Sequence, residues 1–384
     1  MGQEEKPPVS TGVPSRLRVG YNYPGPSNQF GFWIGPHNRQ DKWPPDYATQ
    51  WKELPWKSTI QSNLATLQQN GIEVVRWFLM GNGWNYGPLP TKETKTHYFP
   101  AVRTEVLWHF DPPDRLDPLF VSHFQQLLEL HKSANMKMIP SLVSFEFFET
   151  DKTENTGAGG RVEVATDWRK RNTFLFTVLG EFLRVSNDYR PWIEAWEVIN
   201  EPAWDVRMIT PTLMSRPHDP FVDQASMNEF IRLSLAWIED RGFPSTVGHR
   251  FFSDLSDMPT GTRRQFHYYA DNYPFADPTL GLPKASDTQG AFIGEFGSSV
   301  GEGFELNETP NKGHGGHPWS RELPKGEDKD AANTVYERLK VIKKLGYELA
   351  LVWPDYNDGN IDSRDALKIS PQKLQSIKRF HDSQ

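Results

Sequence analysis

The sequence predicts an α/β fold, a (β/α)8 TIM barrel with long loops on the C-terminal face of its strands. Short apolar runs with high β propensity alternate with longer amphipathic stretches, which is the pattern of a parallel sheet covered by helices. Long polar segments follow several of these runs, whereas the turns that lead back into them are short, as at Asn70-Gly71. The length of 384 residues suits one barrel with insertions.

The eight expected strands are apolar runs of strand-like length. They cover residues 17–23, 72–79, 137–145, 192–200, 247–254, 265–269, 291–295 and 349–353. Five expected helices cover residues 58–70, 118–135, 167–187, 223–241 and 331–345. Asp167 and Asp223 suit helix N-caps, and Gly71 and Gly346 stand where a C-terminal glycine belongs. The helices after the fifth and sixth strands are not evident in the sequence.

The long polar segments cover residues 24–56, 81–117, 146–166, 203–220 and 296–329. All of them lie on the strand-to-helix side, where barrels carry their active sites. The sequence contains no internal repeat and no linker between domains, so residues 17–384 are interpreted as a single catalytic domain. Residues 1–16 are expected to form a disordered N-terminal segment.

The composition excludes several classes of function. The net charge is −7, from 42 basic and 49 acidic residues without a basic cluster, so no nucleic-acid partner is expected. No apolar run approaches the roughly 18 residues of a membrane span. The absence of cysteine excludes disulfides, iron–sulfur clusters and thiolate zinc sites. Residues 1–11 contain no apolar segment of the kind found in signal peptides.

Two glutamates stand at the ends of expected strands. Glu201 follows the apolar run that ends at Ile199-Asn200, and a proline comes directly after it. Glu295 lies in the run Ala291-Phe292-Ile293-Gly294-Glu295-Phe296-Gly297, whose glycines permit an abrupt turn. Two strand-end carboxylates in one α/β chain are what general-acid and nucleophile chemistry on a glycosidic bond requires.

These motifs resemble those of the retaining glycoside hydrolases of clan A, and most of all glycoside hydrolase family 5, the cellulase and mannanase family. The resemblance rests on Asn200-Glu201-Pro202 after the fourth strand and Gly294-Glu295-Phe296-Gly297 after the seventh. Further matching pieces are Gly20-Tyr21-Asn22, the run from Gly71 to Arg76, His267-Tyr268-Tyr269 and Trp353. Each piece is short, and their order at barrel spacing carries the resemblance.

The resemblance implies a role for each matching residue. Glu201 would be the acid/base and Glu295 the nucleophile, about 5–5.5 Å apart as in a retaining site. The remaining implied roles are as follows: Asn200 binds the sugar 2-hydroxyl, Arg76 and Tyr269 hold Glu295 ionised, His267 lines the site, and Trp353 forms a stacking floor. Asn22 and Trp84 are further expected substrate-binding residues. Glu201 is expected to start protonated, which the charge of Glu295 favours.

The implied protein is a secreted, monomeric enzyme that binds a carbohydrate and needs no metal or other cofactor. The rings of Trp33, Trp43, Trp84, Tyr86 and Trp108 lie in the segments after the first two strands and could stack on sugars, although they could equally pin those loops to the barrel rim. The sequence leaves open glucan or mannan as substrate, endo or exo action, and a non-catalytic carbohydrate-binding barrel.

Several residues have competing interpretations. Glu197 lies four residues before Glu201 and is interpreted as an interior carboxylate paired with a base, which could be Arg76. His267 could be a buried histidine without a catalytic role. The third strand lacks the histidine often found at its tip in the family, because Ser144 or Phe145 stands there, and this leaves the sugar undetermined.

Three other motifs match known signatures only in part. The run Gly297-Ser298-Ser299-Val300-Gly301 has the spacing of a serine-hydrolase nucleophile elbow, but a glycine-rich segment follows it where that motif needs a helix. The run 355–360 lacks the spacing of a calcium loop. His314 and His317 are interpreted as part of a solvated loop and not as metal ligands.

Overall fold

The computed structural model describes residues 16–23, 56–79, 91–97, 103–109, 112–116, 118–148, 161–206, 221–268, 282–296, 335–353, 369 and 371–384. Of the expected disordered segment at residues 1–16, these ranges include Arg16 and leave out residues 1–15. No helix in these ranges is long and apolar enough to cross a membrane.

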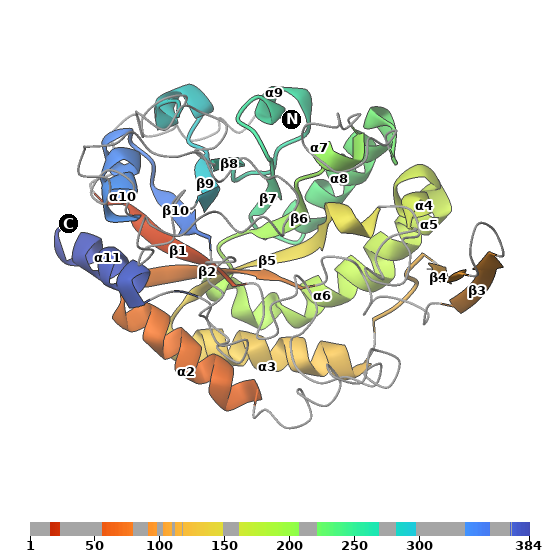
Figure 1. The fold of residues 1–384 in the computed structure, drawn as a ribbon, viewed down its shortest axis with the longest axis horizontal. Helices are drawn as coiled ribbons and strands as arrows, with labels where there is room; N and C mark the ends of the chain where they lie inside the picture. The colour runs from red at the N-terminus through yellow and green to blue at the C-terminus, as the bar shows by residue number, and fades with distance from the viewer. Residues whose placement is uncertain are drawn as a thin grey trace, which may run out of the picture.

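Eight parallel strands form the barrel, which confirms the predicted fold class (Figure 1). In chain order they are β1 (Arg18–Tyr23), β2 (Ile72–Phe78), β5 (Lys137–Ser144), β6 (Trp196–Asn200), β7 (Ser245–Gly248), β8 (Gln265–Tyr268), β9 (Phe292–Phe296) and β10 (Leu349–Val352). They are hydrogen-bonded in the order β7-β6-β5-β2-β1-β10-β9-β8. Between β7 and β8 the contact is a bridge of His249 and Phe266, with the amide of His267 donating to the carbonyl of His249 at 2.8 Å.

Helices surround the strands in Figure 1. The longer ones are α2 (Trp56–Gln69), α3 (Pro118–Ala134), α8 (Gln224–Glu239), α10 (Val335–Lys344) and α11 (Pro371–Asp382). Between β5 and β6, α4 (Val162–Thr166) and α5 (Trp168–Thr173) precede a π-helical turn, η3 (Phe174–Leu179), which continues into α6 (Gly180–Val185). Short elements complete the set: η2 (Phe145–Phe147), η4 (Asn187–Trp192), α7 (Ala203–Val206), α9 (Asp254–Asp257) and η6 (Ala285–Thr288).

Four of the expected helix ends are confirmed by their capping residues. The side chain of Asp223 accepts a hydrogen bond from the amide of Ser226 at 2.8 Å, and Asp167 accepts one from the amide of Arg169 at 2.8 Å. Gly71 and Gly346 have φ values of 83° and 89°, a left-handed conformation that glycine adopts without steric cost. These four residues therefore start or end helices as their sequence positions indicate.

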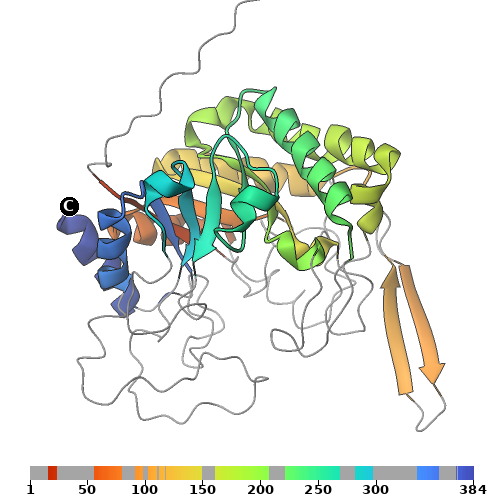
Figure 2. The ribbon, with the colours of Figure 1, turned by 90° about the horizontal axis from the view of Figure 1, so that it is seen from above.

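Some parts of the fold differ from the expectation, and the connections after β7 and β8 explain why no helix is evident there in the sequence. The fifth strand ends at Gly248, and Asp254 begins the short helix α9 instead of ending a strand. The connections after β7 and β8 contain only the four-residue helices α9 and η6 within the described residues, which are too short for an amphipathic period. A hairpin of β3 (Thr91–His97) and β4 (Arg103–His109) extends away from the barrel in Figure 2.

The core has two parts. Most apolar side chains lie between the strands and the surrounding helices. Inside the barrel, a smaller apolar cluster consists of Val74, Ile139, Phe292, Leu349 and Leu351. On β2 and β5, alternation along the strand then places Arg76 and Ser141 on the same inner face as Val74 and Ile139, one step further toward the C-terminal end. The barrel therefore carries buried polar groups directly beneath the end where the active site is expected.

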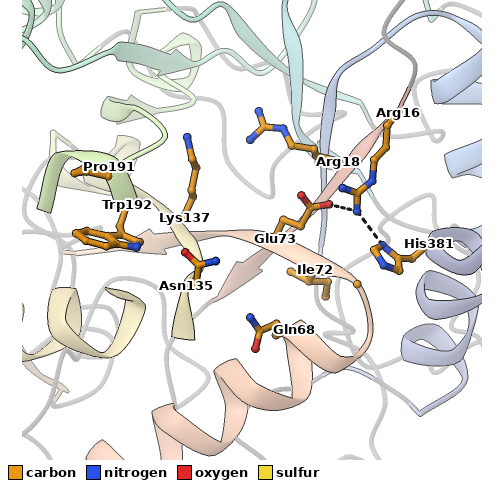
Figure 3. Close-up of a pocket in the computed structure, with 11 residues that line it drawn as sticks. Arg16, Arg18, Gln68, Ile72, Glu73, Asn135, Lys137, Pro191, Trp192 and His381 are labelled. Carbon is orange, nitrogen blue, oxygen red and sulfur yellow. Dashed lines mark hydrogen bonds and ion pairs between the residues drawn. The ribbon is translucent and has the colours of Figure 1, made fainter. Parts of the chain in front are cut away.

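A cavity of about 490 Å³ lies at the opposite end of the barrel. Its lining includes Arg18, Ile72 and Lys137, the first residues of three strands (Figure 3). Next to these strand starts, the buried carboxylate of Glu194 binds Arg18 at 2.7 Å, and Arg263 at 3.0 Å. Burial alone would raise the pKa of Glu194, but these cations lower it to about 2. The charged groups here are therefore paired with one another, and this cavity is separate from the strand-end carboxylates.

Candidate active site

The two predicted catalytic glutamates meet at the C-terminal end of the barrel. Glu201 directly follows the last residue of β6, and Glu295 is the penultimate residue of β9. Together with His267 of β8 they form a group in which one ligand atom from each residue lies within 4.8 Å of the others. Because all the strands are parallel, residues distant in sequence converge at this end.

Glu201 is held in a strained backbone conformation. Its φ of 49° lies in the left-handed region, which residues other than glycine seldom adopt. Its amide donates to the carbonyl of Gly248 at 2.7 Å, which fixes the chain where it leaves β6. The carboxylate is fixed as well, because Trp204 Nε1 donates to Oε2 at 2.6 Å and His267 Nδ1 lies 2.8 Å from Oε1.

The environment of Glu201 favours its charged form. Burial would raise its pKa, but the hydrogen bond from His267, the positive charge of Arg250 and the indole donor of Trp204 together lower the pKa below its usual value. This lowered pKa runs against the expectation that Glu201 starts protonated, which stays a prediction. The physical reason is that His267, Arg250 and Trp204 together outweigh the burial of this carboxylate.

Arg76 connects the nucleophile candidate to the barrel interior. Its fully buried guanidinium has five N–H groups, and each one has an acceptor. Nη1 donates to Glu295 Oε1 at 2.5 Å and to Asn22 Oδ1 at 2.9 Å. Nη2 donates to Asn200 Oδ1 at 2.7 Å and to Glu197 Oε1 at 2.6 Å, and Nε donates to Glu197 Oε2 at 2.8 Å. Burial opposes the charge, but the two carboxylates raise the pKa of Arg76 above its usual value.

Glu197 is the interior carboxylate that the sequence predicts, and its base is Arg76. It is fully buried and accepts hydrogen bonds from both Arg76 and Ser141 Oγ, the latter at 2.5 Å. Gln265 Nε2 donates to its Oε2 at 2.8 Å. Arg76 thus has both of the alternative roles considered for it, since it neutralises Glu197 and also orients Glu295.

Asn22 differs from its expected role as a substrate-binding residue. It is fully buried, its Oδ1 accepts from Arg76, and its Nδ2 donates to the carbonyl of Gly294 at 3.0 Å. Asn22 therefore positions Arg76 and is not exposed to bind a sugar. Asn200 is slightly exposed, and its Nδ2 donates to Ser144 Oγ at 3.3 Å. Ser144 is the last residue of β5, so it stands at this strand tip and Phe145 lies beyond it.

Trp353 lies directly after β10 and is half-buried. Its amide donates to the carbonyl of Phe296 at 2.7 Å, one residue after Glu295. Its ring meets Phe78 edge to face with 6.2 Å between centroids, and the Arg76 guanidinium lies 4.5 Å from the centre of the same Phe78 ring. Trp353 therefore contacts the same Phe78 ring as Arg76, the cation that binds Glu295.

Several predicted residues fall outside the described part of the chain. They are Tyr269, Trp84, and the other three loop aromatic residues Trp33, Trp43 and Tyr86. The backbone of Trp108 belongs to β4, but its side chain is likewise not described.

Three residues of the site were not predicted. Trp204 binds Glu201, Arg250 lies 3.5 Å from the centre of the Trp204 ring, and Gln265 contacts both Glu197 and His267. Gln265 could have been found from its position, because it lies two residues before His267 and therefore on the same face of β8. Trp204 and Arg250 lie in connections, where periodicity carries no information.

The group of Glu201, His267 and Glu295 is compact enough to surround a cation. Its surroundings disfavour one, because Arg76 donates to Glu295 and would place a buried positive charge beside the ion. Trp204 also occupies one oxygen of Glu201. The arrangement suits proton transfer and nucleophilic attack by carboxylates better than metal binding.

No protein-family model matches the chain, and no curated protein matches it in sequence. Solved structures match it over most of its length. A β-mannanase from the blue mussel Mytilus edulis has 15% identity and a TM-score of 0.56, covering 95% of this chain and 92% of that one. A β-1,4-D-mannanase from Cryptopygus antarcticus has 14% identity and a TM-score of 0.57, covering 94% and 90%.

A third match is a protein of glycoside hydrolase family 5 from Streptomyces cattleya, solved in complex with Manβ1-4GlcNAc. It has 12% identity and a TM-score of 0.55, covering 96% of this chain and 80% of that one. At these identities the likeness concerns the fold. The chain therefore has the (β/α)8 barrel fold found in β-mannanases and in glycoside hydrolases of family 5, as the sequence motifs indicate.

Proposed function

We propose that this protein is a retaining glycoside hydrolase that cleaves β-glycosidic bonds in a polysaccharide or oligosaccharide by double displacement. The observation that carries the proposal is the pair of carboxylates at the ends of β6 and β9, with oxygens of Glu201 and Glu295 within 4.8 Å of each other. Retaining enzymes need a short separation because the nucleophile attacks the anomeric carbon directly, whereas inverting enzymes leave room for a water.

The surroundings of the two carboxylates support different roles. Glu295 is bound by the buried cation of Arg76, which favours a charged nucleophile. Glu201 is bound by His267 and Trp204 and is more exposed than Glu295, which suits a group that exchanges a proton with the leaving group and then with water. Asn200 occupies the last position of β6, directly before Glu201, where its amide could bind a sugar hydroxyl.

The proposed substrate is a β-mannan or β-glucan. Both of the mannanases described above, and another similar structure that is named as a cellulase of family 5, favour a β-1,4-linked polymer. A polymer of this kind is met outside the cell, so we also propose secretion. Exo action on small glycosides remains the alternative within the same chemistry.

A non-catalytic carbohydrate-binding barrel is less well supported. The left-handed φ of Glu201 costs on the order of 1–3 kcal/mol, and the fully buried Arg76 and Glu197 must also be desolvated. Sugar binding alone requires neither feature. Strained residues and buried charges that persist at a strand end are typical of catalytic sites.

The test is hydrolysis of purified β-mannan, mixed-linkage β-glucan and xyloglucan, followed by reducing-sugar release. Proton NMR of the first product formed from a short oligosaccharide then reports its anomeric configuration. A β product that later mutarotates supports double displacement. An initial α product would contradict the retaining mechanism, and no hydrolysis of any β-glycan or aryl glycoside would favour the binding barrel.

The low pKa of Glu201 leads to a prediction for its indole partner. Replacing Trp204 by phenylalanine removes a donor to the charged carboxylate, so the pKa of Glu201 should rise. Because the acid must be protonated in the first step, activity is lost as pH rises through this pKa, and the basic limb of the kcat/KM profile should move to higher pH. Phe145 packs against Trp204 at 5.9 Å, and Phe145→Leu is the control for lost packing. An unchanged basic limb in Trp204→Phe would contradict the assignment of Glu201 as acid.

A further inference from the structure

We propose that Gln265 is a positioning residue that fixes the tautomer of His267, so that the Nδ1–H of this histidine is always directed at the two catalytic carboxylates. The catalytic consequence rests on the function proposed above, whereas the tautomer itself does not. Gln265 and His267 lie two residues apart on β8 with both side chains buried. Gln265 lies on the far side of the imidazole from Glu201 and Glu295.

The orientation of the Gln265 amide is set by Glu197. Gln265 Nε2 lies 2.8 Å from Glu197 Oε2. Glu197 already accepts two hydrogen bonds from the guanidinium of Arg76, so it is the charged partner of a cation and can only accept. The NH2 group of Gln265 must therefore face Glu197. Thr246 Oγ1, at 3.3 Å from Gln265 Oε1, donates to the other end of the amide and agrees with this orientation.

The same NH2 group determines which nitrogen of His267 carries the proton. Gln265 Nε2 lies 3.4 Å from His267 Nε2, and an amide nitrogen can donate but not accept. His267 Nε2 must then be the acceptor, which leaves the proton on Nδ1. The other side of the ring agrees, because Nδ1 lies 2.8 Å from Glu201 Oε1 and 3.4 Å from Glu295 Oε2, both acceptors.

The neighbouring strand leaves room for this arrangement. Gly294 of β9 lies against Gln265, and a Cβ atom there would sit 2.1 Å from Gln265 Nε2. Any side chain at this position would displace the amide. The glycine that precedes Glu295 thus makes space for a polar contact inside the barrel.

These contacts connect Arg76 to both carboxylates by a second route. Arg76 binds Glu295 directly. It also binds Glu197, and Glu197 orients the amide of Gln265. Gln265 in turn orients His267, whose Nδ1 faces Glu201 and Glu295. If His267 adopted the other tautomer, the lone pair of Nδ1 would face two carboxylate oxygens and repel them. Glu201 would then lose one of its two fixed donors, and its position over the glycosidic oxygen would be less well defined.

The experiment is NMR of the protein labelled with ¹⁵N at histidine, in which two-bond proton–nitrogen couplings of the ring distinguish the tautomers. The His267 signals are identified by their loss in His267→Asn. In the wild type we expect the Nδ1–H form. Gln265→Met removes the donor with little change in volume, and Gln265→Glu offers an acceptor, so we expect a tautomer mixture in the first variant and the Nε2–H form in the second. Thr246→Val keeps both Gln265 donors and should keep the wild-type tautomer.

Kinetic measurements then test whether the tautomer of His267 affects catalysis. We expect Gln265→Met to lower kcat about tenfold with little change in KM, because Glu201 is misplaced while the sugar contacts remain. An Nε2–H tautomer in the wild type, or an unchanged Nδ1–H signal in Gln265→Met, would overturn the proposal. Unchanged kcat alongside a changed tautomer would overturn its catalytic part. If the wild type hydrolyses no glycoside, the proposed function fails, while the NMR result still decides the role of Gln265.

Discussion

Replacing Glu295 by alanine is expected to reduce hydrolysis by several orders of magnitude. The proposed reaction forms a covalent glycosyl intermediate on this carboxylate, so its removal eliminates the first step and not merely a contact. The same change removes one acceptor of Arg76 but leaves Glu197, Asn22 and Asn200 in place around the guanidinium. The fold should therefore persist, and circular dichroism with a melting curve checks it.

Azide separates the role of Glu295 from that of Glu201. In Glu295→Ala, azide can occupy the vacated space and attack an activated glycoside directly, which gives an inverted glycosyl azide. In Glu201→Ala, the intermediate on Glu295 still forms from an activated substrate, and azide then releases it with retained configuration. Rescue with the opposite stereochemistry in either variant, or near-normal activity without azide, would contradict the assignment.

Glu197→Gln is the matched control for this experiment. Glu197 shares Arg76 with Glu295 and is equally removed from solvent, so its loss disturbs the same ion pairs. It lies below the strand ends and is not placed to attack the sugar. We expect lower stability and some loss of activity in Glu197→Gln, with no rescue by azide. Azide rescue in this variant would mean that the rival interpretation of Glu197 as a reacting carboxylate is correct.

Much of the barrel could be predicted because its strands are apolar runs bounded by glycine, proline or capping residues. The segment 137–144 is an example, since it is buried after its first residue and lies between two parallel neighbours. The hairpin of β3 and β4 could not be found in this way. The β3 sequence Thr-Lys-Glu-Thr-Lys-Thr-His has no apolar alternation, and among the described residues this strand pairs with β4 in a two-stranded sheet separate from the barrel sheet.

The candidate site could be predicted for residues on strands and less well elsewhere. Glu201, Glu295, Arg76 and His267 could be predicted because each lies on a strand or directly after one, and parallel strands bring those places together. The lowered pKa of Glu201 could be predicted only in part, because besides His267 it depends on Arg250 and Trp204, which lie in two separate connections. The sequence motif predicts a sugar contact for Asn22, but this side chain is buried. A motif indicates which residue type stands at a position and not how exposed that residue is.

Replacing Arg76 by methionine is expected to have the largest effect on stability. This change would leave Glu197 and Glu295 without their cation, although Glu197 is fully buried and Glu295 is nearly so. Removal of one partner from a buried ion pair costs roughly 3–5 kcal/mol. Arg76→Lys keeps the charge but offers one compact donor group in place of five fixed N–H groups. It should recover part of the stability and little of the activity.

Urea unfolding of Arg76→Met, compared with Arg263→Met, tests this expectation. Arg263 also binds two carboxylates, Glu194 and Glu348, but it is partly exposed, so water can replace it and the loss should be much smaller. The pH dependence of the stability lost in Arg76→Met provides a second check. A buried carboxylate without a cation is favoured in its protonated form, so the stability lost in Arg76→Met should be smaller near pH 5 and larger near pH 7. If Arg76→Met unfolds no more easily than Arg263→Met, or if the difference does not grow as pH rises, then Arg76 does not neutralise the two carboxylates, and Glu295 must be kept charged by another group.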